Sequence, residues 1–217
     1  MQKLTYALEP NGPKRLEVSW KAMWKEFKVK VDDRVVGRAS GQKELREGKR
    51  FRLKDGSYLS VKLVNKLTGV DLEILHDGQP LPGTSADPAT RLKNAYRTVF
   101  LVAGLNTVLG LVAVLLEAPF LQALGIGFYS ILFGLIFLVL GVYVKRKSRL
   151  ALILSVVIFA LDSVLGIILT TASGLTPSPG GLLARILLMI PMVQGIQAIR
   201  TLKRRAEEPS AKAQRGS

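Results

Sequence analysis

Hydrophobic and polar residues alternate along much of the first 88 residues of the chain. From Arg15 onward, apolar side chains stand at every second position in five short runs, at 16–20, 27–31, 51–53, 59–63 and 70–74. Such alternation is typical of strands with one buried face. The pattern predicts an antiparallel β-meander or small sandwich of about five to seven strands.

Residues that favour tight turns separate these runs. Asp55-Gly56 and Asp77-Gly78 are strong signals for two-residue hairpins, because a type I′ turn needs positive φ angles that Gly and Asp tolerate. Asp32-Asp33 and Thr68-Gly69 are weaker signals of the same kind. The Pro- and Gly-rich stretch 80–88 then predicts a short linker that extends the chain before the first long apolar segment.

Beyond this linker, long apolar runs replace the alternation. Four segments, at about 98–116, 125–144, 150–170 and 182–199, come close to the ~20 residues that a helix needs to cross a bilayer. The fourth carries Arg185, Pro191, Gln194 and Gln197, so the other spans must protect it, or it inserts only in part. The predicted fold class is α+β: a β-rich domain at 1–88, a four-helix transmembrane bundle at 89–206 and a disordered polar tail at 207–217.

One phrase occurs twice inside the apolar part. Leu105-Asn106-Thr107-Val108-Leu109-Gly110 returns 56 residues later as Leu161-Asp162-Ser163-Val164-Leu165-Gly166. Each copy opens a helical hairpin that ends in a basic cluster. Two tandem hairpins of the same orientation are related by an axis along the membrane normal. Coincidence between low-complexity apolar segments is the alternative.

The charges beside the spans predict the orientation. Eleven cations lie on one side, namely Arg91, Lys93, Arg97, Lys145, Arg146, Lys147, Arg149, Arg200, Lys203, Arg204 and Arg205. The connections on the other side, around Ala118-Pro119 and at 173–180, carry none. By the positive-inside rule both termini are cytoplasmic.

Glycines recur every seven residues on the second span, at Gly127, Gly134 and Gly141. This spacing keeps them on nearly one helix face, where a neighbouring backbone can approach closely. The sequence leaves open whether that neighbour is the first span, the third span or another copy of the chain.

A few polar groups fall at membrane depth. Asp162 lies about 18 Å from the cytoplasmic start of its span at 1.5 Å rise per residue, and Arg185 lies within about one turn of the same depth. We expect them to pair, with Asn106, Ser163 and Gln194 as candidates to join them. The group either lines a polar path for a proton or small ion or fixes the helix register. We favour the structural role, because one acid and one base neutralise each other.

The head also has a basic strand face with Lys28, Lys30, Arg50, Arg52, Lys54 and Lys62. This face either lies on anionic lipid headgroups or is simply solvated. Trp20 and Trp24 close a small core or bind a partner. Of the formal net charge of +15, residues 1–90 carry +5 and residues 91–217 carry +10. Most of the excess therefore abuts hydrophobic spans, which argues against nucleic-acid binding.

The chain offers little for catalysis. It has no cysteine, which excludes disulfides, thiolate metal sites and cysteine nucleophiles. His76 is the only histidine, so neither a transition-metal site nor a Ser-His-Asp triad has a recognisable context. The sequence contains no phosphate-binding Gly-rich loop and no H-E-x-x-H or EF-hand pattern. We expect no cofactor, no metal and no enzymatic activity.

Two resemblances extend this interpretation. The short strands and the hairpin His76-Asp77-Gly78-Gln79 make the head loosely similar to the β-sandwich of the Fas apoptosis inhibitory molecule family. As a whole, the chain resembles the uncharacterised small bacterial proteins, such as occur in cyanobacteria, that join a cytoplasmic β-rich head to four spans. The resemblance implies a multi-pass protein of a bacterial plasma or internal membrane. It names no activity.

Two functions agree with these observations. In the first, the protein is a non-enzymatic scaffold, whose cytoplasmic β-domain is anchored by four helices and binds a protein partner. In the second, it is a small oligomeric channel or transporter with Asp162 in a polar path. Neither the partner or solute nor the oligomeric state follows from the sequence.

Overall fold

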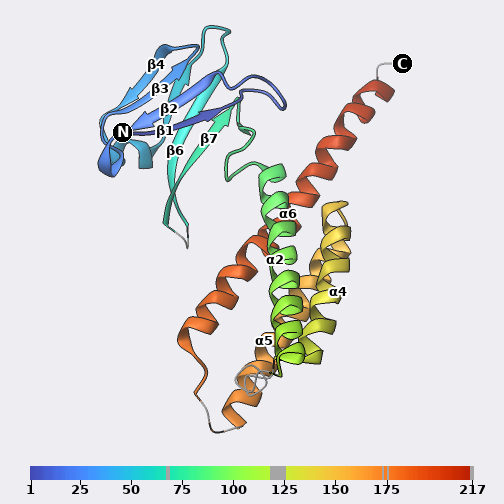
Figure 1. Cartoon of the computed structure of the whole chain (residues 1–217). Coiled ribbons are helices and arrows are strands. Elements are labelled where there is room, and N and C mark those ends of the chain that lie inside the picture. The colour runs from blue at the N-terminus through green and yellow to red at the C-terminus, as the bar shows by residue number, and fades with distance from the viewer. Residues whose placement is uncertain (67–68, 118–125, 173, 175, 216–217) are drawn as a thin grey trace. The chain divides into compact units, whose positions relative to one another are not determined.

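The structure is a computed structural model that describes residues 1–66, 69–117, 126–172, 174 and 176–215 (Figure 1). The chain divides into two compact units, Met1–Thr90 and Arg91–Ser217. The first is an antiparallel β domain and the second contains four long apolar helices, so the α+β class predicted from the sequence is confirmed.

Eight strands lie in the described part of the first unit, in two four-stranded sheets. The first sheet has the order β1 (Gln2–Tyr6), β2 (Leu16–Trp20), β3 (Phe27–Val31) and β4 (Arg34–Ala39). The second has the order β5 (Lys49–Arg52), β6 (Tyr58–Lys66), β7 (Gly69–His76) and β8 (Gln79–Pro80), after the short helix α1 (Gln42–Glu47). Each sheet is an antiparallel meander. The alternation identified β2, β3, β5, β6 and β7, but missed β1, β4 and β8, which lack a regular row of buried residues.

Both sheets contribute to one core, which makes the unit a small sandwich. Its buried residues include Leu16, Val18, Phe27 and Val29 from the first sheet and Phe51, Leu59, Val61 and Ile74 from the second. The two sheets meet closely where Gly37 of β4 faces Phe51 of β5. A Cβ added to Gly37 would lie 2.2 Å from Phe51 Cδ1, so the ring occupies the space that a side chain would need. Trp20 is buried in this core and stacks on Trp24 with 4.6 Å between ring centroids.

The turns agree with the sequence in two places and differ in one. Val31 pairs with Arg34, and His76 with Gln79, across two-residue loops in which Asp32, Asp33, Asp77 and Gly78 all have positive φ. The expected two-residue hairpin at Asp55-Gly56 is wrong, because Arg52 pairs with Tyr58 and the loop is longer. Asp55 instead accepts hydrogen bonds from Ser57 N and Oγ, which closes a wider turn. Thr68 lies outside the described residues.

The segment before the first long helix is not the extended linker that its prolines predict. Leu81 is buried in the core of the β domain, and successive turns join Thr84 N to Leu81 O and Asp87 N to Thr84 O. Asp87 then caps the helix that starts at Pro88, since its carboxylate accepts hydrogen bonds from Ala89 N and Thr90 Oγ1. The turns and the cap fold the segment locally.

The described part of the second unit contains four helices long and apolar enough to cross a membrane. They are α2 (Pro88–Leu115), α4 (Phe128–Lys145), α5 (Arg149–Ala172) and α6 (Pro179–Arg215). Helix α6 ends at Arg215 and so includes residues 207–215, which the sequence assigns to a disordered polar tail. The connection around Ala118-Pro119 lies outside the described residues.

The glycine stripe of α4 packs against α2. A Cβ on Gly134 would lie 2.7 Å from Thr107 N and 2.8 Å from Ala103 O, and one on Gly141 would lie 2.9 Å from the Phe100 ring. The space around Gly127 Cα is open, but its carbonyl oxygen lies 2.9 Å from a Cβ built on Gly110. The first span is thus the neighbour that the sequence left open.

The two copies of the repeated phrase each end in a glycine that lies beside the second helix of its hairpin. The first copy ends in α2 at Gly110, which contacts Gly127 and Ile131 at the start of α4. The second copy ends in α5 at Gly166, which contacts Arg185 in the second turn of α6. Gly110 thus admits the backbone of the following helix, whereas Gly166 meets the guanidinium of Arg185, so these contacts do not decide between duplication and coincidence.

Candidate functional site

The structure brings Asp162 and Arg185 together. Arg185 Nη1 lies 3.4 Å from Asp162 Oδ2 and donates a hydrogen bond of 3.2 Å to the backbone carbonyl of Asp162. Asp162 lies in the middle of α5 and Arg185 near the start of α6, so the contact joins the two helices of the second hairpin at membrane depth. The Asp162 side chain is 43% exposed and that of Arg185 is 37% exposed, so the pair is not enclosed by the four helices.

Gly166 leaves the space that the Arg185 guanidinium occupies, a role that sequence reasoning did not assign. A Cβ on Gly166 would lie 3.3 Å from both terminal nitrogens of Arg185. Gly166 stands one helical turn after Asp162, so the guanidinium lies across the turn that joins them. The position of Gly166 in the repeat, equivalent to the helix-contacting Gly110, is the sequence signal that could have identified it.

The other candidates for the polar cluster lie apart from the pair or bond within their own helix. Asn106 Nδ2 donates to Val102 O at 2.9 Å, and Ser163 Oγ donates to Phe159 O at 2.7 Å, each four residues back along its helix. Gln194 is exposed on α6, nine residues or about 14 Å of helix beyond Arg185. The ion pair thus comprises two of the five residues.

The eleven cations beside the spans gather at one end of the helical unit. At this end Gly195 of α6 approaches Ala95 of α2 and Leu152 of α5, while Gly141 of α4 approaches Phe100 of α2. These contacts bring together the start of α2, the end of α4, the start of α5 and the second half of α6, which carry the eleven residues together with the short connection between α4 and α5. Arg149 Nε is buried there without a hydrogen-bond partner. We call this the cationic end.

The basic residues of the head do not form one face. In β3 the inward residues are Phe27 and Val29, so Lys28 and Lys30 point away from the core on the first sheet. In β5 the inward residue is Phe51, so Arg50 and Arg52 point outward from the second sheet. The two sheets share a core between them, and the two basic groups therefore lie on opposite outer surfaces.

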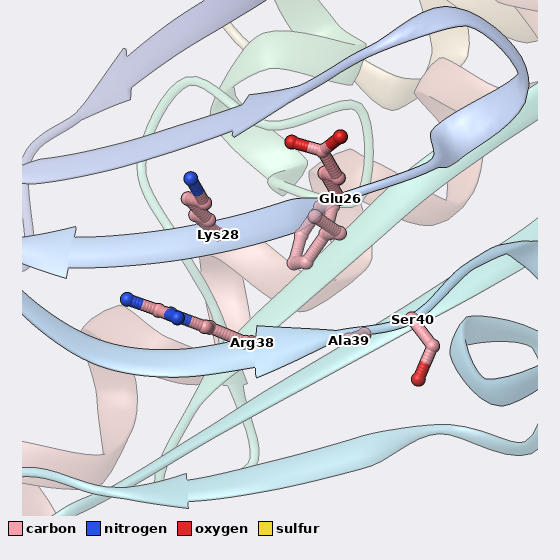
Figure 2. Close-up of a pocket in the computed structure, with 6 residues that line it drawn as sticks. Glu26, Lys28, Arg38, Ala39 and Ser40 are labelled. Atoms are coloured by element: carbon pink, nitrogen blue, oxygen red, sulfur yellow. The ribbon is translucent and has the colours of Figure 1, made fainter.

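The first of these surfaces contains a pair of like charges. Lys28 of β3 and Arg38 of β4 are direct cross-strand partners. They line a shallow depression together with Glu26, Phe27, Ala39 and Ser40, and Figure 2 shows both cationic side chains extending from neighbouring strands toward the same side. Like charges placed directly opposite each other destabilise a sheet. We call Lys28 and Arg38 the cation pair.

Other cations of the head have carboxylate partners. Lys3 and Lys30 both contact Glu17, Lys21 contacts Glu26, and Arg15 contacts Asp32. The hydrogen bond from Lys21 is the main cause of a lowered pKa at Glu26, and nearby Lys28 adds a smaller effect in the same direction. Within the described chain, neither member of the cation pair makes an ion pair of its own.

A hydrogen-bonded series in the second sheet includes the only histidine. His76 Nε2 lies 2.9 Å from Ser57 Oγ, which donates to Asp55 Oδ1 at 2.6 Å. In a catalytic triad the imidazole lies between the acid and the hydroxyl and removes the hydroxyl proton. Here the Ser57 hydroxyl lies in the middle and donates its proton to Asp55, so these hydrogen bonds stabilise the loop between β5 and β6. The described residues contain no cluster of three His, Asp or Glu side chains that could hold a metal ion.

Sequence reasoning missed Arg38 because it did not predict β4. The turn at Asp32-Asp33 followed by Val35 and Val36 was the available signal for a strand, but a bulge between Val29 and Lys30 disturbs its alternation against β3.

The chain matches no protein-family model, no curated protein and no solved structure. The function is therefore inferred from the Asp162–Arg185 pair and from the cation pair.

Proposed function

We propose that the protein is a non-enzymatic, membrane-anchored binding module, whose β domain captures an acidic segment of a partner protein. The cation pair carries this proposal. Among the described residues neither Lys28 nor its cross-strand partner Arg38 makes an ion pair. Lys28 attracts Glu26, which pairs with Lys21, while the neighbouring Lys3 and Lys30 pair with Glu17. A carboxylate-rich partner would remove the repulsion between Lys28 and Arg38, and complementary charge would also guide its approach.

The helical unit suits an anchor. Its four helices are long and apolar enough to span a membrane, and its eleven cations gather at one end. Cations next to spans favour the cytoplasmic side and attract anionic headgroups. We therefore place the head and both termini in the cytoplasm. In this proposal the Asp162–Arg185 contact fixes the register of α5 against α6.

The experiment compares two double charge reversals in the full-length chain. Lys28→Glu with Arg38→Glu alters the cation pair, and Arg50→Glu with Arg52→Glu makes the same change in net charge on the other sheet, where the cross-strand partners are Ser60 and Tyr58. Each variant is extracted in native lipid discs, and the proteins bound to it are quantified by mass spectrometry. We expect a stoichiometric acidic partner with the wild type and the Arg50/Arg52 variant, and its loss from the Lys28/Arg38 variant.

Two results would contradict the proposal. Loss of the partner from both variants would mean that net charge alone governs association. Retention in both variants, together with loss after deletion of residues 1–87, would move the binding surface elsewhere on the head.

One observation favours a second function, that of a small channel or transporter. The Asp162–Arg185 pair remains partly exposed although it lies mid-span, and ionisable groups at this depth often mark a solute path. Flux through proteoliposomes, wild type against Asp162→Asn, tests this function without involving the head.

A further inference from the structure

The packing of the helical unit changes along its length. Near the cationic end all four helices contribute buried side chains, among them Ala95, Phe137, Leu152 and Met192. Farther away, no described residue of α5 after Phe159 is buried, and none of α6 before Met192. Helices α2 and α4 remain in contact there through Gly110 and Ile131, whereas the first half of α6 stands away from α2 (Figure 1). The two hairpins therefore pack closely only in the half that carries the cations.

Three polar residues of the loosely packed half lie on the faces that are buried in the other half. Asp162 stands seven residues after Ser155, Arg185 seven residues before Met192, and Asn106 seven residues after Val99. Ser155, Met192 and Val99 are all buried. Because seven residues are close to two helical turns, each polar residue shares a helix face with its buried partner. All three thus lie on the side of their helix that is buried in the closely packed half, rather than on its exposed side.

These residues also share a depth. Asn106 is eleven residues from Ala95, Asp162 is ten from Leu152, and Arg185 is ten from Gly195. Ala95 and Leu152 both lie against Gly195. At 1.5 Å per residue, all three polar residues therefore lie about 15–17 Å from one common layer, near the middle of a bilayer core of about 30 Å.

Hydrocarbon is an unfavourable neighbour for such a layer. A charged side chain at the bilayer centre is costly, and the pair is 43% and 37% exposed where helix packing would otherwise cover it. We propose that water fills the space between the two hairpins from the end opposite the cations down to the level of Asn106, Asp162 and Arg185. Water satisfies the remaining hydrogen-bonding capacity of both charged groups, and this vestibule requires neither a partner of the head nor transport.

The absence of cysteine permits a direct test, because each introduced thiol is the only one in the chain. Asn106→Cys and Leu182→Cys place thiols on the inward faces, since Leu182 lies three residues before Arg185 on the partly buried side of α6. Val108→Cys and Leu183→Cys are controls on the outward faces of the same helices, at similar depth, where both native side chains are 58% exposed. A charged, membrane-impermeant methanethiosulfonate is added to sealed vesicles from either side, and the remaining thiols are counted after denaturation.

The vestibule predicts faster modification of the inward thiols, because the reactive thiolate forms only in contact with water. We expect them to react at least about tenfold faster than the controls, and only from the side opposite the cations. Two inward positions on different helices guard against a single variant that fails to fold. Slow reaction at all four positions would overturn the proposal in favour of lipid filling. Disulfide-linked dimers through Asn106→Cys would overturn it in favour of a second copy.

Discussion

Arg38→Glu provides a sharp test of the cation pair, because the structure predicts that losing this surface cation stabilises the head. Arg38 is the direct cross-strand partner of Lys28. The substitution turns a repulsive pair into an attractive one, and each such pair contributes roughly 0.2–1 kcal/mol. The removed repulsion and the new attraction both add to the free energy of unfolding. Since Arg38 is exposed, we expect their sum to lie in the lower part of its range, a gain of about 0.5–1 kcal/mol. The bond from Lys49 Nζ to the Arg38 carbonyl does not depend on the side chain.

The readout is available in the full-length protein. Both tryptophans, Trp20 and Trp24, belong to the head, so intrinsic fluorescence follows the unfolding of this unit alone. A gain of this size corresponds to a rise in Tm of about 2–8 °C for a domain of this length. Arg50→Glu is the matched control, because its cross-strand partner Ser60 is neutral and no comparable gain is expected.

The reasoning is refuted if Arg38→Glu lowers Tm or if Arg50→Glu raises it equally. A rise in Tm that accompanies loss of the partner would show that this surface trades stability for binding.

Three further predictions concern the two units. Gly37→Ala should destabilise the head by about 1–3 kcal/mol, because the new methyl group would overlap the Phe51 ring. Gly41→Ala is the control and should cause no such loss, because the space around Gly41 is open. Equal losses for the two variants in tryptophan fluorescence melts would exclude the close approach of the two sheets. Asp162→Asn and Arg185→Gln should each lower thermal stability in nanodiscs. The double variant should lose clearly less stability than the two single losses added together, because both substitutions break the same contact. Additive losses would contradict the ion pair. Hydrogen bonding from Arg15 lowers the pKa of Asp32, so its stabilising contribution is complete above the unfolded-state pKa and disappears as the pH falls toward the lower, folded-state pKa. Fluorescence melts between pH 6 and about pH 3 should therefore show a smaller acid-induced loss of Tm for Asp32→Asn than for the wild type, and identical losses would be the contrary result.

Local pattern was sufficient for several features of the fold. The runs that became β2, β3, β6 and β7 each present one apolar face, and the turns at Asp32-Asp33 and Asp77-Gly78 depend on backbone preferences of the turn residues themselves. The four apolar helices follow from length and composition alone. Stretches without such a pattern were misjudged: β1 has an exposed surface, and the proline-rich segment from Leu81 to Asp87 folds through turns and a helix cap.

The candidate sites needed more than local pattern. Matching depths brought Asp162 and Arg185 together correctly, because an antiparallel hairpin fixes depth from residue counts. Counting residues along the helices could not show that Gly166 makes room for the Arg185 guanidinium, or that the two hairpins pack less closely at the depth of this pair.

The sequence by itself determined a β-rich head, four apolar helices and eleven cations beside them, because these features depend on residues that are near neighbours in the chain. Only the tertiary structure decided that Lys28 stands beside Arg38, that the basic residues divide between two outer surfaces, and that the glycines of α4 meet α2. These are contacts between distant segments. Strand register and helix facing, rather than local periodicity, select them.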